Sequence, residues 1–309
     1  MRHSESIPAP DVEGILEEAE LWTELPLFDY AMKRFCFEMV AFHGGSRIAN
    51  LGMGHTLAWA AAVLIVYLDH QRAEGVTSTE ILRLCDAGGI GGRKAVGSAI
   101  DALRSAGLVS IHPKPNDARA KRLRPTAALF DLHHDNLAAR LTALEILQPL
   151  SAPASEVARR LPTLLAFLGG NVEAFARTRF RLYDKFPEVR AFMDRSCGYM
   201  ILLDLLRRVH FPGDEPLTSE ASPSHLAAQF HVSRAHVRKL LQNAHENGWI
   251  LAPEGGQIIL DPRFFRRMRL WIGAEFVWMW RLVGREARDS QTANPDLRNS
   301  AISGANSSL

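Results

Sequence analysis

An internal repeat constrains the fold of this chain more than any other feature of its sequence. A glycine followed by two apolar residues, a pattern typical of a helix end that leads into a strand, occurs at Gly107-Leu108-Val109. The same pattern returns 141 residues later at Gly248-Trp249-Ile250. Residues of similar kind recur at this offset through the preceding helix, and further back the offset becomes 144, where Ser78 corresponds to Ser222. The chain therefore predicts two copies of one fold unit.

Apolar residues at helical spacing dominate both copies, so we expect a mainly α-helical protein. Each copy predicts, in order, a long apolar helix, a short helix, a turn, a second helix, a hairpin and a last long helix. Capping signals support this order, since Thr77-Ser78-Thr79-Glu80 has the form of a capping box. Ser222-Pro223 and Ser233 are expected to start the two corresponding helices of the second copy. The first long helices are expected near 56–71 and 199–209, and the hairpins at 109–123 and 250–260.

The domain boundaries follow from this repeat and from changes in composition. A Pro- and Ser-containing stretch separates the two copies, and the last residues are rich in Ser, Asn, Ala and Gly, which is typical of disorder. We expect an acidic N-terminal arm at 1–24, a first unit at 25–147, a linker at 148–162, a second unit at 163–285 and a disordered tail at 286–309.

The charge of the chain is unevenly distributed. Residues 1–30 hold eight acidic residues and one basic residue, a net charge of −7. Because the whole chain carries +2, the remaining 279 residues carry +9, which favours an anionic partner for the body of the protein. One hypothesis is that the acidic arm competes with that partner for the basic surface.

Three widely spaced cysteines predict a reducing compartment, because they form neither an even disulfide set nor a metal-binding pattern. The N-terminus lacks the apolar segment of a signal peptide. The longest apolar run, 57–68, is too short to span a bilayer. We therefore expect a soluble cytoplasmic protein with no membrane association.

Two short helices joined by a turn and followed by a hairpin describe a winged helix-turn-helix, whose second helix fits the major groove of DNA. In the second copy that helix places basic and amide side chains at i, i+4, i+8 and i+11. In the first copy the hairpin carries most of the basic residues, a composition that suits a narrow minor groove. The expected DNA-binding residues are Arg93, Lys94, Ser98, Arg104, Lys114, Asn116, Asp117, Arg119, Lys121, Arg122, Arg124, Ser233, Arg234, His236, Arg238, Lys239, Gln242 and His245.

Residues 54–147 resemble a MarR-family transcriptional regulator. The hairpin reads Asp117-Ala118-Arg119 and ends at Pro125-Thr126, which is similar to the family pattern Asp-x-Arg-x-x-x-x-x-Leu-Thr except that proline replaces leucine. The resemblance implies that the aspartate orients the arginine, which enters the minor groove. It also implies a helical dimerisation core, which two copies in one chain would form internally as a pseudo-dimer. Family members often bind small aromatic or anionic ligands, so the resemblance implies a small-molecule effector of unknown identity.

Other motifs do not support an enzyme, a metal or a cofactor. Gly88-Gly89-Ile90-Gly91-Gly92 lacks the Gly-Lys-Ser/Thr end of a phosphate-binding loop and is interpreted as a turn between helices. His133-His134-Asp135 lacks a third ligand at zinc spacing and is interpreted as a solvated helix surface. The aromatic residues of the last helix, from Phe264 to Trp280, are interpreted as core.

We therefore expect tandem winged helix-turn-helix domains with a shared helical core, acting as a sequence-specific double-stranded DNA-binding transcriptional regulator. The two predicted recognition helices differ, which favours a non-palindromic site. Two alternatives stay open: a plasmid-type replication initiator, and a protein-interaction module with a degenerate second winged helix. The sequence indicates neither the target genes nor whether further chains associate.

Overall fold

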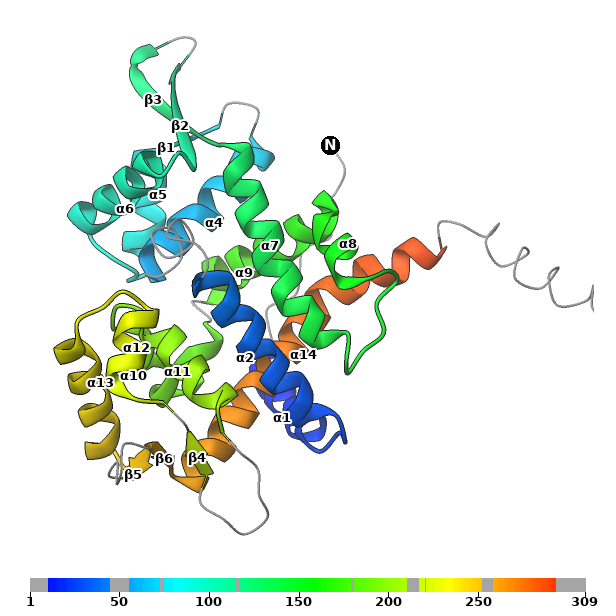
Figure 1. Ribbon diagram of the computed structural model, residues 1–309. Helices are drawn as coiled ribbons and strands as arrows, with labels where there is room; N and C mark the ends of the chain where they lie inside the picture. The colour runs from blue at the N-terminus through cyan, green and yellow to red at the C-terminus, as the bar shows by residue number, and fades with distance from the viewer. Residues whose placement is uncertain are drawn as a thin grey trace, which may run out of the picture.

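The computed structural model describes residues 11–44, 56–72, 75–114, 117–178, 181–209, 217–219, 221–251 and 258–292, and these form a mainly helical protein with two small sheets (Figure 1). This confirms the helical class expected from the periodicity. In the part of the chain that the structure describes, no helix combines the length and the apolar character needed to cross a membrane.

The first half contains a helix, a short strand, two helices and a hairpin. The sheet has the strand order β1-β3-β2, with both pairings antiparallel, so the strand before the two helices pairs with the second strand of the hairpin. The elements are α4 (Thr56–Gln71), β1 (Val76–Thr77), α5 (Ser78–Ala87), α6 (Arg93–Ser105), β2 (Val109–Lys114) and β3 (Asp117–Pro125).

The second half repeats this order of elements. Its sheet has the order β4-β6-β5, again antiparallel, so each strand occupies the place of its counterpart in the first half. The hairpin is much shorter than that of the first half. The elements are α11 (Gly198–Arg207), β4 (Leu217–Ser219), α12 (Pro223–Gln229), α13 (Arg234–Glu246), β5 (Ile250–Leu251) and β6 (Ile258–Leu260).

The glycines that anchor the repeat end α6 and α13 in the same way. Gly107 and Gly248 both have φ of +72°, in the left-handed region where a side chain is disfavoured. The amide of each donates to a carbonyl three residues earlier, and the next amide donates to a carbonyl five residues earlier. The offset of 141 residues predicted from the sequence thus joins two identical backbone turns.

The expected helix caps are present. Thr77 and Glu80 form a capping box, in which the Thr77 hydroxyl accepts from the amide of Glu80 and the Glu80 carboxylate accepts from the amide of Thr77. The hydroxyls of Ser222 and Ser233 cap α12 and α13. Since Thr77 and Ser222 are the equivalent caps, the offset here is 145 residues, one more than the sequence alignment predicted.

The remaining helices join the two halves. The α2 helix packs against both α7 and α11, and α14 packs along α1 and also contacts α9 (Figure 1). The bounds of these elements are α1 (Val12–Thr23), α2 (Phe28–Gly44), α7 (Ala127–Leu144), α8 (Ala154–Arg159), α9 (Leu161–Thr178), the 3-10 helix η1 (Leu182–Lys185), α10 (Pro187–Met193) and α14 (Pro262–Thr292).

One continuous hydrophobic core extends through both halves. Phe276 of α14 makes edge-to-face contacts with Phe28 and Phe35 of α2, at centroid distances of 6.2 and 5.6 Å. Trp271 of α14 meets Tyr199 of α11 in the same geometry at 5.9 Å. The aromatic residues of the last helix are therefore core residues, as expected from their spacing.

The N-terminal segment differs from the free acidic arm that the sequence suggested. Residues 12–23 form α1, which buries Ile15, Ala19 and Trp22 in the core. The carboxylate of Glu18 pairs with Arg281 of α14 at 2.8 Å. The expected linker 148–162 likewise contains α8, and α14 continues to residue 292, beyond the predicted end of the second unit.

The interpretation of His133 as a solvated residue is wrong. His133 is 1% exposed and its ring lies 4.9 Å from that of Trp59 on α4. The adjacent His134 contacts the backbone carbonyl of Ala158 in α8. The sequence gave no sign that α4 and α8 cover this part of α7, because both are distant along the chain.

Candidate nucleic-acid interface and central pocket

The α13 helix separates an apolar face from a polar face. Val237, Leu240, Leu241 and Ala244 are buried on the face toward the body of the protein. The cap at Ser233 fixes where the helix starts. The exposed side chains opposite the buried face are those of Arg234, Arg238, Lys239, Gln242 and His245.

The cations of this exposed face are available to an anion. Arg234, Arg238 and Lys239 have no ion pair with any residue that the structure describes. Gln242 donates to the carboxylate of Glu246 at 3.0 Å, and His245 contacts the backbone carbonyl of Ile250 at 3.1 Å. The positive charge therefore lies in the first two turns of the helix.

Two of the expected contact residues in α13 have structural roles instead. The hydroxyl of Ser233 accepts from the amide of His236 at 3.1 Å and completes the cap. The ring of His236 is half-buried and lies 2.9 Å from the carbonyl oxygen of Ser196, between α10 and α11. His236 thus fastens α13 to the body and does not belong to the exposed basic face.

The α6 helix has the same two-sided arrangement with a different distribution of charge. Val96, Ile100 and Leu103 are buried, whereas Arg93, Lys94 and Ser98 are exposed. Arg93 and Lys94 have no ion pair among the described residues. Arg104 differs, because its guanidinium pairs with Asp101 at 2.9 Å. The free cations of α6 therefore lie at its N-terminal end.

The hairpin β2–β3 holds fewer exposed cations than the sequence suggested. Lys121 is exposed, but Arg122 is only 8% exposed, which does not fit a phosphate-contacting role. Arg124 pairs with Asp69 of α4 at 3.0 Å and so anchors the hairpin to the body. The strands contain Lys114, Asp117 and Arg119, but their side chains, and all of Asn116, lie outside the described part of the structure.

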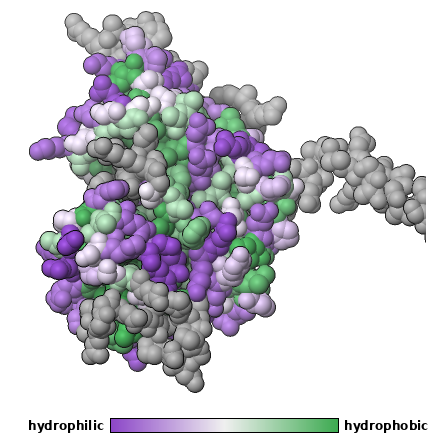
Figure 2. Space-filling view, viewed as in Figure 1, coloured by the Kyte–Doolittle hydropathy of each residue, from purple (hydrophilic) through white to green (hydrophobic). Residues whose placement is uncertain are grey.

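Both basic helices lie along the same edge of the molecule. In the view of Figure 1, α6 and α13 form the left-hand edge, the hairpin β2–β3 projects at the top, and α14 lies on the opposite side. This left-hand edge carries many hydrophilic side chains (Figure 2). The arrangement would let one extended polyanion contact both helices.

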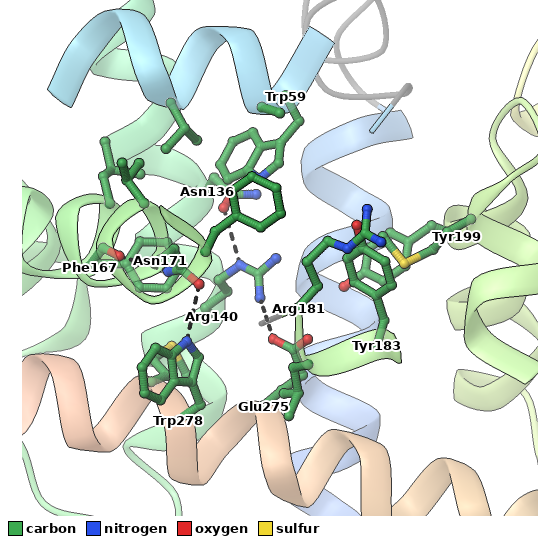
Figure 3. Close-up of a pocket in the computed structure, with 18 of the residues that line it drawn as sticks. Trp59, Asn136, Arg140, Phe167, Asn171, Arg181, Tyr183, Tyr199, Glu275 and Trp278 are labelled. Carbon is green, nitrogen blue, oxygen red and sulfur yellow. Dashed lines mark hydrogen bonds and ion pairs between the residues drawn. The ribbon is translucent and has the colours of Figure 1, made fainter. Parts of the chain in front are cut away.

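A pocket of about 250 Å³ lies between the two halves. Its walls come from α2, α4, α7, α9, α11 and α14, together with the turn after α5 and the segment around η1. Arg140 of α7 lies at the centre of the view in Figure 3, where its guanidinium donates to Asn136 at 3.2 Å and pairs with Glu275 of α14 at 3.3 Å. The Trp278 indole donates to Asn171 at 3.1 Å beside them.

Sequence reasoning did not find this pocket. Its polar residues come from helices up to 135 residues apart, as for Arg140 and Glu275, and no short motif contains them. Within the described ranges, no three His, Cys, Asp or Glu side chains are grouped so that they could hold a metal ion. Comparisons with protein-family models, curated proteins and solved structures found no match to this chain.

Proposed function

We propose that the protein is a sequence-specific double-stranded DNA-binding regulator whose two halves are winged helix-turn-helix units. In this proposal α6 and α13 are the recognition helices, and β2–β3 and β5–β6 are the wings. The observation that carries it is the combination of the shared strand order of the two sheets with unpaired cations on the exposed face of the second helix in each half. A helix so exposed, next to a hairpin, fits the major groove.

The strength of binding would come mainly from phosphate neutralisation. The five cations without ion pairs on these helices are Arg93, Lys94, Arg234, Arg238 and Lys239. If each neutralises one phosphate, log K falls with log salt concentration with a slope of about −4.5. Arg104 and Arg124 add little to this slope, since Asp101 and Asp69 already balance their charges.

The unlike composition of the two helices determines the form of the binding site. On α13, Arg238 and Gln242 suit guanine and adenine respectively, whereas the exposed end of α6 offers Arg93, Lys94 and Ser98. One chain therefore prefers two different half-sites. The expected result of selecting duplexes from a random pool at near-physiological salt is a bipartite, non-palindromic sequence.

Matched arginine variants test the assignment of the binding face. We expect Arg238→Ala to weaken binding to the selected site by about 1–3 kcal/mol, and Arg104→Ala to leave it nearly unchanged because Asp101 already pairs with that side chain. Equal effects of the two variants, or no enrichment of any duplex, would contradict the proposal.

One observation favours a second function. The β5–β6 hairpin is short, and Leu251 at its start is 47% exposed, which suits a protein contact better than a phosphate contact. In that case the second half would bind a protein and only the first half would bind DNA. A selected sequence with a single half-site, unaffected by Arg238→Ala, would support this alternative.

A further inference from the structure

We propose that the central pocket binds a neutral, planar aromatic molecule of about two fused rings that carries a hydroxyl group. The pocket lies away from the exposed faces of α6 and α13. The proposal therefore goes beyond DNA binding and can be tested without DNA.

The polar end of the pocket has hydrogen-bonding capacity that the protein leaves unused. His43 of α2 lines the pocket and is 3% exposed, yet its Nδ1 atom has no hydrogen-bond partner. The amide nitrogen of the buried Asn136 reaches only the Met39 sulfur, at 4.0 Å, which is a weak acceptor. A buried polar group without a partner is costly, so a ligand that supplies one gains affinity.

A hydroxyl group fits this pair of residues. A neutral imidazole offers one donor and one acceptor nitrogen, and an amide nitrogen donates. Met39, which Asn136 contacts, lies one helical turn before His43 on α2. A ligand hydroxyl placed there can donate to the imidazole and accept from the Asn136 amide.

The charges in the pocket favour a neutral ligand. The positive charge of Arg140 is balanced by Glu275 at 3.3 Å, and that of Arg181 by Asp184 at 2.9 Å. Burial, with the nearby Arg140, lowers the pKa of His43 to about 4, so this ring is uncharged at neutral pH. Arg195 also lines the pocket without an ion pair among the described residues, but it is exposed and water screens its charge. A buried carboxylate would lack a free cation.

The size and walls of the pocket set the rest of the ligand. An apolar cavity of about 150 Å³ holds a benzene molecule, so about 250 Å³ accommodates a second ring. The walls carry aromatic side chains from four elements, including Trp59, Phe167, Tyr183 and Trp278 (Figure 3). Such walls suit stacked and edge-to-face contacts with a planar ring system.

The experiment measures binding of three probes to the full chain by isothermal titration calorimetry at pH 7.5. The probes are 2-naphthol, 2-methoxynaphthalene, which cannot donate a hydrogen bond, and the 2-naphthoate anion. We expect 2-naphthol to bind about tenfold more tightly than either of the others. Equal or tighter binding of 2-naphthoate, or no binding of any probe, would overturn the proposal.

Two variants locate the site. His43→Leu should reduce the affinity for 2-naphthol about tenfold, to that of 2-methoxynaphthalene, and leave the latter unchanged. Ala174→Leu extends a side chain from the pocket wall on α9 and should weaken all probes, whereas Ala176→Leu on the exposed face of the same helix is the matched control. An unchanged preference for 2-naphthol in a folded His43→Leu protein, or equal binding by the two alanine variants, would refute the site. If His43→Leu does not fold, the probe series and the alanine pair still decide.

Discussion

Acidification should destabilise this protein through His133, and the size of the effect follows from its burial. His133 is 1% exposed beside Trp59, and burial, together with the nearby His134, lowers its pKa to about 3. In the unfolded chain a histidine has a pKa of about 6.5. Between these values the unfolded state binds a proton that the folded state does not, so stability falls as pH falls.

The magnitude is about 2 kcal/mol at pH 5, because 1.5 pH units below 6.5 correspond to about 1.4 kcal/mol each. At pH 7 the same residue contributes almost nothing. His43, with its pKa lowered to about 4, adds a second loss of similar size in the window from 6.5 to 4. Together the two histidines account for about 4 kcal/mol, which is a large share of the stability of an ordinary domain.

Urea unfolding followed by circular dichroism at pH 7, 6 and 5, at constant ionic strength, measures this loss. His133→Phe keeps an aromatic ring against Trp59 and removes the titrating group, so it should lose about 2 kcal/mol less than the wild type between pH 7 and pH 5. His70→Phe, at an exposed position on α4, is the control for removal of a histidine. The same pH dependence in wild type and His133→Phe would refute the reasoning.

Three further results are expected. Gly248→Ala should lower the free energy of unfolding by about 1 kcal/mol, and Gly248→Asn by less, because φ is +72° there and asparagine tolerates this conformation; thermal unfolding measures both. Ser222→Ala should cost about 1 kcal/mol through loss of the α12 cap, whereas Ser222→Asp should cost little, as denaturant titration would show. Arg140→Glu should cost about 3 kcal/mol by placing two carboxylates together, and the double variant Arg140→Glu/Glu275→Arg should recover most of that loss; failure to recover would show that packing, not charge, dominates at this pair.

Local chemistry explains what could be predicted from the sequence. The turns at Gly107 and Gly248 and the caps at Thr77, Ser222 and Ser233 depend on residues within a few positions of one another, so their patterns are visible in a single chain. The same holds for the separation of apolar and polar faces on α6 and α13, which follows from helical spacing.

Contacts between distant segments explain what could not be predicted. The pairing of Arg124 with Asp69 and the burial of Arg122 remove two expected contact residues from the hairpin surface. His133 is buried because α4 covers it, and Glu18 is held by Arg281, 263 residues away. A charged or polar side chain gives no local sign of which remote element will cover or neutralise it.

The pair of Arg140 and Glu275 explains why a single-chain pseudo-dimer differs from a dimer of identical chains. Thr126 and Asp261 are equivalent starting positions in the two halves, because their amides donate to Leu108 and Trp249 in the same place after each glycine turn. Arg140 and Glu275 each lie 14 residues after these positions, so equivalent sites carry opposite charges and meet at 3.3 Å.

In a symmetric dimer the same residue would occupy both places, and two like charges at this distance would repel each other strongly. Two copies in one chain remove that restriction, since each half can change its sequence without changing the other. The same freedom permits one long and one short hairpin, and recognition helices with different side chains. The asymmetry of the central pocket and the asymmetry expected of the DNA site thus have one physical origin, which is the covalent joining of two units that no longer need to be self-complementary.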